Sequence, residues 1–207
     1  MNIIIDYGRG NLKSLKIALD RIGMDSRISS DIEEIRNAGS VIIPGVGAFA
    51  DAMQAMEDAG LTEIIKEVAR SGKHMLGICL GMQLLYEKGY EYGEHSGLGI
   101  LKGSIRYLDI DEKVPHMGWN SLKFNQKQDP ILKNINEDDY VYFVHSYYAD
   151  SDGKEVVAYA DYGKKIPAIV RSGNIYGIQF HPEKSGAVGE EILKAYKDIV
   201  DNIKEKK

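Results

Sequence analysis

The first 80 residues alternate short apolar runs with segments of helical periodicity, and this alternation constrains the fold more than any other feature. Runs of strand length lie at residues 2–6, 24–28, 40–43 and 74–78, and helical patterns lie at residues 12–22, 31–36, 49–59 and 61–70. Such β-α repetition predicts a parallel sheet with helices packed on both faces. Functional residues are then expected at the carboxyl edge of its strands.

The second half of the chain, from Gly99 onward, has a different texture. Short runs rich in β-branched and aromatic residues are joined by turn residues, and they predict strands at residues 100–108, 121–124, 140–148, 155–160, 168–171 and 175–180. A last helix is expected over residues 189–204, with Ile192, Tyr196, Ile199 and Ile203 on one side. The predicted fold is therefore a three-layer α/β domain with a mostly parallel central sheet and antiparallel additions, and we expect residues 1–207 to form a single domain.

The only cysteine of the chain lies where the fourth predicted strand meets a predicted helix over residues 82–87. The sequence there is Gly77-Ile78-Cys79-Leu80-Gly81. Glycines on both sides of a reactive residue are typical of a nucleophile elbow, a tight and strained turn that exposes the reactive atom at the sheet edge. The positive end of the following helix favours the thiolate form. The alternative is a buried thiol that packs as a small hydrophobe.

A candidate base follows the last predicted strand. His181 and Glu183 are two residues apart, which in an extended segment places both side chains on one face, and Pro182 keeps the segment out of helical geometry. A carboxylate in this position can orient one imidazole nitrogen and leave the other for a thiol, as in a Cys-His-Glu triad. A surface ion pair at a strand end is the alternative for this segment taken alone.

Together the segments G-x-C-x-G-x-Q and H-P-E resemble those of class I, triad-type glutamine amidotransferases over nearly the whole chain. The resemblance implies that Cys79 attacks the side-chain amide of L-glutamine, with His181 as acid and base and Glu183 as its orienting carboxylate. A thioester reaction needs two N–H donors for its oxyanion. Leu80 can supply one, and the glycine-rich loop after the third strand is expected to supply the other; the resemblance implies the backbone of Val46 and Gly47.

The same resemblance suggests substrate-binding residues. Gly45 and Gln83 match positions of the family's motifs, and His145, Ser146 and Tyr147 match a segment whose backbone helps to bind glutamine. Outside the motif, Gln83 would be interpreted as an exposed polar residue. His145 is a rival base that ranks below His181, because no carboxylate stands two residues after it.

Three further segments, at residues 6–15, 114–120 and 181–185, resemble the glutaminase subunits of imidazole glycerol phosphate synthases, enzymes of histidine biosynthesis. In that family a (β/α)8-barrel cyclase subunit receives the ammonia in a heterodimer, and the resemblance places Asn11, Met117, Trp119, Asn120 and Lys184 at or near the cyclase interface. Trp119 could instead be a core aromatic. The alternatives are the glutaminase subunit of another amidotransferase, such as anthranilate synthase, and a thiol hydrolase of related fold.

Composition argues against several other classes of protein, namely those that bind nucleic acid, membranes or metals and those held by disulfides. The net charge is −5, and Lys and Arg are scattered, so nucleic acid is not expected as a partner. The apolar run at residues 2–6 is too short for a signal peptide or a membrane span, so no membrane is expected either. One cysteine cannot form a disulfide framework and fits a reducing cytoplasm. The remaining histidines lack the spacing of metal ligands, so no metal and no cofactor is predicted. Arg9 is given no role.

Overall fold

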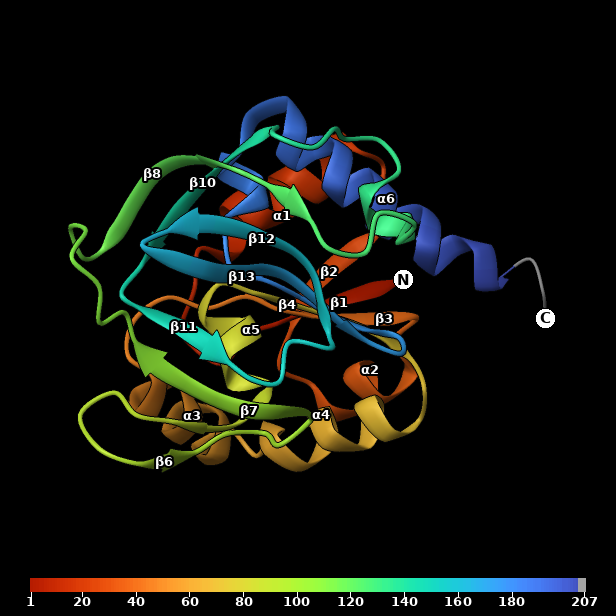
Figure 1. Ribbon diagram of the computed structural model, residues 1–207. Coiled ribbons are helices and arrows are strands. Elements are labelled where there is room, and N and C mark those ends of the chain that lie inside the picture. Colours follow the sequence, from red (N-terminus) through yellow and green to blue (C-terminus); the bar gives the residue numbers. More distant parts are fainter. Residues whose placement is uncertain (205–207) are drawn as a thin grey trace.

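A computed structural model describes the backbone of residues 1–204 and the side chains of residues 1–202. Its centre is an eight-stranded sheet in the order β2-β1-β3-β4-β14-β13-β12-β9, with helices above and below (Figure 1). The β-α part comprises β1 (Asn2–Ile5), α1 (Leu12–Arg21), β2 (Ser26–Ser29), α2 (Ile32–Asn37), β3 (Ser40–Ile43), α3 (Phe49–Asp58), α4 (Leu61–Arg70), β4 (His74–Ile78) and α5 (Leu80–Leu84).

Five strands of this sheet are parallel. β1 pairs in parallel with β2 and β3, β3 with β4, and β4 with β14 (Ile175–Ile178) from the far end of the chain. The sheet is completed on one side by three antiparallel strands, β13 (Lys164–Ser172), β12 (Val156–Tyr162) and β9 (Lys123–Phe124). The predicted fold class is therefore confirmed, including the antiparallel additions.

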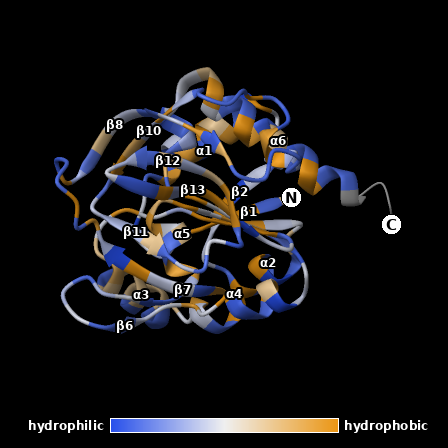
Figure 2. Ribbon diagram, viewed as in Figure 1, coloured by the Kyte–Doolittle hydropathy of each residue, from blue (hydrophilic) through white to orange (hydrophobic). Residues whose placement is uncertain are grey.

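The central strands are buried on both faces, which explains their continuous apolar runs. In β1, Ile4 packs on the side of α1 and the last helix, α6 (Gly186–Lys204), whereas Ile3 and Ile5 pack on the side of α2, α3 and α4. This alternation follows the two-residue period of a strand. Figure 2 shows the resulting hydrophobic centre between helices whose outer faces are more polar.

The strands between α5 and β14 form two smaller sheets in addition to the antiparallel extension. One has the order β11-β7-β5-β6, from Tyr147–Asp150, Leu101–Tyr107, Tyr86–Gly89 and His95–Ser96; the other is the antiparallel pair of β8 (His116–Ser121) and β10 (Tyr140–His145). Two short 3-10 helices, η1 (Pro130–Leu132) and η2 (Pro182–Lys184), complete the order of elements.

Three predictions of local structure were wrong, each because tertiary pairing decided the outcome. The helix expected up to residue 87 ends at Leu84, because the carbonyls of Leu84 and Leu85 accept from the backbone N–H groups of residues 98, 100 and 101, and the chain then continues as β5. The expected strand over residues 140–148 is interrupted at Ser146, where the chain passes from one small sheet to another. Strand β8 was not predicted before residue 121.

The last helix begins at Gly186, three residues earlier than expected. Ile192 and Tyr196 are fully buried on its inner side, and Ile199 packs partly buried against the same core. The side chain of Ile203 lies outside the described residues. No helix within the described part of the chain has the length and apolar character that a membrane span needs.

Candidate active site

The site is built where three neighbouring parallel strands end. β3, β4 and β14 lie side by side in the sheet, so the segments that follow them meet at one edge: the loop from Pro44, then Cys79, then the segment that leads to His181. The register pairs Ile78 with Ile178, and the backbone N–H of Cys79 donates to the carbonyl of Ile178 at 2.7 Å. Segments distant in sequence are thereby joined at the base of the site.

Cys79 has the strained backbone that an elbow requires. Its φ of 54° is positive, which is uncommon for a residue with a side chain. A Cβ placed on Gly77 would lie 2.6 Å from the carbonyl oxygen of Gly81 and 2.7 Å from the Cα of Met82, and a Cβ on Gly81 would collide with the carbonyl of Ile43. Both glycines are therefore required by backbone packing.

The His181 imidazole is tied to Glu183. Its Nδ1 lies 2.9 Å from Oε1 of Glu183, with both side chains at least 95% buried. Burial alone would lower the pKa of His181, but its hydrogen bonds to Cys79 and Glu183 favour the charged ring and raise the pKa to about 9. An imidazolium beside the sulfur stabilises a thiolate, the form that attacks carbonyl carbon.

The glycine-rich loop lies against this arrangement and is held at both ends. Tyr7, which follows β1, donates its hydroxyl hydrogen to the carbonyl of Pro44 at 2.6 Å, and burial raises the pKa of this phenol well above its usual range. At the other end, Glu91 accepts from the backbone N–H of Phe49 at 2.7 Å and caps α3. Between them, Val46 is 43% exposed and Gly47 has a φ of +103°.

Cys79 itself is only 7% exposed. A hollow of about 10 Å³ lies beside the imidazole, lined in part by Asn11, Gly45, Val46 and Glu183. That volume suits a single water molecule and is far too small for an amino acid. This hollow is therefore not a substrate site as it stands.

The residues expected to bind substrate surround the elbow from the other side. Gln83 is 6% exposed, so the interpretation as an exposed polar residue is wrong, and its Nε2 donates to the carbonyl of Tyr147 at 3.0 Å. Both ring nitrogens of His145 are occupied, by the Tyr147 carbonyl at 2.8 Å and by His116 at 3.0 Å. Ser146, between His145 and Tyr147 in sequence, is half-buried, and its carbonyl accepts a hydrogen bond from the backbone N–H of Leu108.

His145 is poorly suited to act as a base. Burial, together with neighbouring His116 and His181, lowers its pKa to about 3, so the ring stays neutral at physiological pH. No carboxylate orients it among its hydrogen-bond partners. Its surroundings therefore favour His181 over His145 as the candidate base.

Several of the residues expected at a partner interface face solvent. Met117 is 61% and Trp119 is 55% exposed on β8, so the interpretation of Trp119 as a core aromatic is wrong. Lys184, in η2, is also exposed, and the ring of Trp119 lies close to Gly186 at the start of α6. Asn11 and Asn120 have structural partners: Asn11 caps α1 through the N–H of Ser14, and the amide of Asn120 donates to the carbonyl of Asp161.

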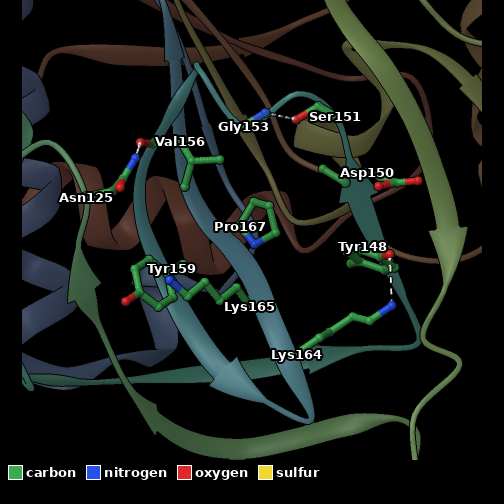
Figure 3. Close-up of a pocket in the computed structure, with 11 residues that line it drawn as sticks. Asn125, Tyr148, Asp150, Ser151, Gly153, Val156, Tyr159, Lys164, Lys165 and Pro167 are labelled. Atoms are coloured by element: carbon green, nitrogen blue, oxygen red, sulfur yellow. Dashed lines mark hydrogen bonds between the residues drawn. The ribbon is translucent and has the colours of Figure 1, made fainter.

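A larger hollow, of about 370 Å³, lies away from the elbow between β11 and the β12–β13 pair (Figure 3). Lys164 and Tyr148 approach one another across it, with a hydrogen bond of 3.0 Å between Nζ and the phenol oxygen. None of the residues expected to act on substrate lines this hollow. Its lining includes Tyr148 and Ala149, which follow Tyr147 in sequence. Size alone therefore does not locate the reactive centre of this molecule.

Sequence reasoning missed three side chains of the site. Tyr7 and Glu91 hold the glycine-rich loop, and Gln179, fully buried just before His181, reaches the sulfur of Cys79 with its Nε2 at 3.9 Å. The one available signal was for Gln179, a polar residue at the end of an otherwise apolar predicted strand. The contacts of Tyr7 and Glu91 depend on loops that no local pattern places together.

Comparison with known proteins agrees with this geometry. Residues 3–196 match the family model described as glutamine amidotransferase class-I. A protein from Oceanobacillus iheyensis, named imidazole glycerol phosphate synthase subunit HisH, is 51% identical over 97% of this chain and 100% of its own length. A protein of the same name from Lactococcus lactis subsp. lactis is 51% identical over 94% of this chain and 96% of its own.

Solved structures show the same fold at lower sequence identity. One described as a glutamine amidotransferase superposes with a TM-score of 0.76 at 18% identity, covering 96% of this chain and 98% of that one. A structure of PurLQS from Thermotoga maritima gives a TM-score of 0.72 at 20% identity, covering 98% of each chain. These likenesses concern the arrangement of the sheet and helices.

Proposed function

The chain belongs to the class-I glutamine amidotransferase family, and we propose that it is the glutaminase subunit of an imidazole glycerol phosphate synthase. It hydrolyses L-glutamine to glutamate and ammonia and delivers the ammonia to a cyclase subunit in histidine biosynthesis. The observation that carries the proposal is the junction of Cys79 with the buried His181–Glu183 pair at the edge of the parallel sheet. Relatives of the same subunit name, half identical over nearly the whole chain, support the choice of synthase.

The proposed reaction starts with the sulfur. The Cys79 thiolate attacks the side-chain carbonyl carbon of glutamine, and a C–S bond forms while the carbonyl oxygen takes the negative charge. His181 gives its proton to the nitrogen of the leaving amide, so that ammonia departs and a thioester remains. The same imidazole then takes a proton from water, which attacks the thioester and releases glutamate. Glu183, at 2.9 Å, keeps Nδ1 of the ring engaged and leaves Nε2 for the sulfur.

The oxyanion needs donors at the place where its charge develops. We assign these to the backbone N–H of Leu80, at the start of α5, and to the backbone around Val46 and Gly47. The support is positional: β3 and β4 are neighbours, so their following segments face one another across the site. The positive φ of Gly47 gives this loop a conformation that side chains disfavour.

Glutamine itself is assigned to the space bounded by the glycine-rich loop and the strand junction. Gly45 lets the glycine-rich loop lie directly against the elbow, because a Cβ there would collide with the Tyr7 hydroxyl and lie 3.0 Å from the backbone nitrogen of Gly81. Gln83 together with His145, Ser146 and Tyr147 would form the opposite wall. The enclosed sulfur implies that this wall or the loop opens before glutamine enters, which suits an enzyme whose activity depends on a partner.

The partner is assigned to the face that carries Met117 and Trp119. Large exposed aromatics are disproportionately important in protein interfaces. Lys184 lies on η2, directly after His181 and Glu183, so a partner that reached it would also approach the catalytic histidine. We therefore propose a heterodimer with a (β/α)8-barrel cyclase through Asn11, Met117, Trp119, Asn120 and Lys184.

The whole chain is treated as one glutamine amidotransferase domain, because the core on each face of the sheet includes residues from both halves of the sequence. The cytoplasm is the proposed location, since a catalytic thiol must stay reduced to act.

The decisive experiment measures glutamate formation by the full chain with and without a candidate cyclase and its ribonucleotide ligand. Activity is expected to be stimulated by both, and Cys79→Ser should abolish it while the circular dichroism spectrum and unfolding midpoint stay close to those of the wild type. Appreciable turnover by the variant would exclude Cys79 as nucleophile. Full activity without any partner would instead favour an independent thiol hydrolase.

A further inference from the structure

A buried chain of amide groups ends at the sulfur of Cys79. Gln179 is 0% exposed, its Nε2 lies 3.9 Å from Sγ of Cys79, and its Oε1 accepts from Nε2 of Gln83 at 3.0 Å. The same Nε2 of Gln83 donates to the carbonyl of Tyr147 at 3.0 Å. Three segments distant in sequence thus contribute one continuous polar connection through an otherwise apolar part of the core.

The orientation of both amides follows from the backbone at the far end. The carbonyl of Tyr147 can only accept, so the atom of Gln83 that faces it must be the nitrogen. That nitrogen also faces Gln179, which must therefore present its oxygen. The other end of the Gln179 amide, directed at Cys79, is then the nitrogen, and the group that meets the sulfur is an N–H donor.

The carbonyl of Tyr147 is itself held firmly. It also accepts from Nδ1 of His145, whose Nε2 faces His116, and the amide nitrogen of Asn120 lies 3.2 Å from Nε2 of His116. Because Nδ1 of His145 donates, its Nε2 must accept, and His116 then donates from Nδ1 and accepts from Asn120. With both histidines neutral, each of these hydrogen bonds has one donor and one acceptor. The hydrogen bond from His145 therefore holds the Tyr147 carbonyl in place, and this carbonyl fixes the orientation of the Gln83 amide.

We propose that Gln179 is a further catalytic residue of the proposed glutaminase: its amide N–H donates to the Cys79 sulfur and stabilises the thiolate, and Gln83 positions that amide. The inference rests on the proposed role of Cys79 as nucleophile. The thiol proton passes to His181, and the N–H of Gln179 shares the negative charge left on sulfur with the imidazolium. Hydrogen bonds to charged groups are stronger than neutral ones, so burial of this donor in a water-poor site makes its effect substantial.

The proposal predicts how the rate of alkylation of Cys79 depends on pH: the curves of the wild type and of Gln179→Met should cross. A hydrogen bond to an ionised group changes an ionisation equilibrium on the order of tenfold. Without this bond, the thiolate population at neutral pH falls about tenfold. Each remaining thiolate is more basic and therefore roughly threefold more nucleophilic. The variant Gln179→Met keeps the length of the side chain and removes the donor, so it should be alkylated about threefold more slowly near pH 7. Where both sulfurs are fully ionised, it should be alkylated about threefold faster.

The experiment measures the rate of iodoacetamide modification of the full-length chain from pH 6 to 10, with Cys79 as the only cysteine. Gln126→Met is the matched control, because the amide of Gln126 also makes two hydrogen bonds, donated to the backbone carbonyls of Lys154 and Val156, and none of its partners belongs to the site. Its profile should coincide with that of the wild type. A Gln179→Met profile that coincides as well, or that is displaced equally at every pH, would overturn the proposal.

A second variant keeps the test valid if Gln179→Met does not fold. Gln83→Met removes the donor that fixes the Gln179 amide, so the amide can turn its oxygen to the sulfur, and the profile should cross in the same sense. Glutamine turnover with the cyclase partner separates the two proposals. Loss of kcat of about threefold near pH 7 in Gln179→Met, with KM within twofold of the wild type, supports the assignment. An inactive wild type would remove the glutaminase proposal itself, whereas an active wild type with an equally active Gln179→Met would remove only the role of Gln179.

Discussion

The elbow can be tested with one added methyl group. Gly77 lies in β4 without a positive φ, so alanine in its place would be favoured intrinsically, by roughly 0.5–1 kcal/mol, because it restricts the unfolded chain. The added Cβ, however, would lie 2.6 Å from the carbonyl oxygen of Gly81 and 2.7 Å from the Cα of Met82. Carbon–oxygen contacts are normally at least ~3.3 Å, so about 0.7 Å of backbone movement is required.

That movement cannot be absorbed by a rotamer change, because both opposing atoms belong to the backbone of α5. Overpacking of this kind costs about 1–3 kcal/mol. After the intrinsic gain is subtracted, Gly77→Ala should lose about 0.5–2 kcal/mol of unfolding free energy and a few degrees of melting temperature. Cys79 lies between the two clashing positions, so its sulfur moves relative to His181. Displacements of this size in an active site typically reduce the rate by about a hundredfold.

The neighbouring strand offers a matched control. Gly177 is the register partner of Gly77, and the three atoms nearest to a Cβ there would all be side-chain atoms, of Met82 and Val170, the nearest at 2.7 Å. Those side chains can shift, so Gly177→Ala should be milder in both respects. Thermal unfolding and glutaminase assays of the two variants decide the matter. If Gly77→Ala were as stable and as active as Gly177→Ala, the elbow would not be locked by its backbone.

Two further predictions concern Trp119, at the proposed interface, and the buried His116. Trp119→Ala should weaken binding of the cyclase by at least about tenfold in a titration, whereas Ile32→Ala, an exposed apolar change on α2 across the molecule in Figure 1, should leave affinity unchanged. Equal effects would remove Trp119 from the interface. Burial lowers the pKa of His116 to about 4, so the unfolded state binds more protons below the ordinary value of 6.5, and stability should fall as pH drops from 6.5 toward 4, by about 3 kcal/mol. Urea titrations of His116→Phe should lack this component, and parallel pH curves for variant and wild type would contradict it.

The local patterns that predicted the fold correctly were those that tertiary contacts reinforce. Strand β4 and the turn at Cys79 were predictable because a fully buried strand needs a continuous apolar run and a tight elbow needs glycine at both flanks. Residues 86 and 87, the first half of β5, were predicted as helix because nothing local separates them from α5. The strand pairing of β5 with β7 depends on residues 101–105, and Tyr86 is fully buried in the assembled structure. Non-local pairing overrode propensity there.

The candidate site could be proposed from the sequence only where single contiguous segments carry it. Cys79 and the pair His181–Glu183 could be recognised because each motif is short and contiguous. The contact of Gln179 with the sulfur could not, because it requires the register of β4 against β14 and the position of Tyr147 in a different sheet. A polar residue at a strand end has many possible partners, and only the assembled sheet selects one.

The sheet register is therefore as much a part of the reactive centre as its side chains. The pairing of Ile78 with Ile178 fixes the bond from the Cys79 N–H to the Ile178 carbonyl, and this bond joins the strained turn to the strand that leads to His181. A slip of one residue would move the imidazole by about 3.3 Å and reverse which face of the strand each side chain occupies. Because β4 and β14 are buried on both faces, such a slip would also place the wrong side chains in both cores. The energy that holds the core thus also holds the sulfur and the imidazole within reach of each other, and the strain at Cys79 persists because the surrounding sheet leaves it no alternative.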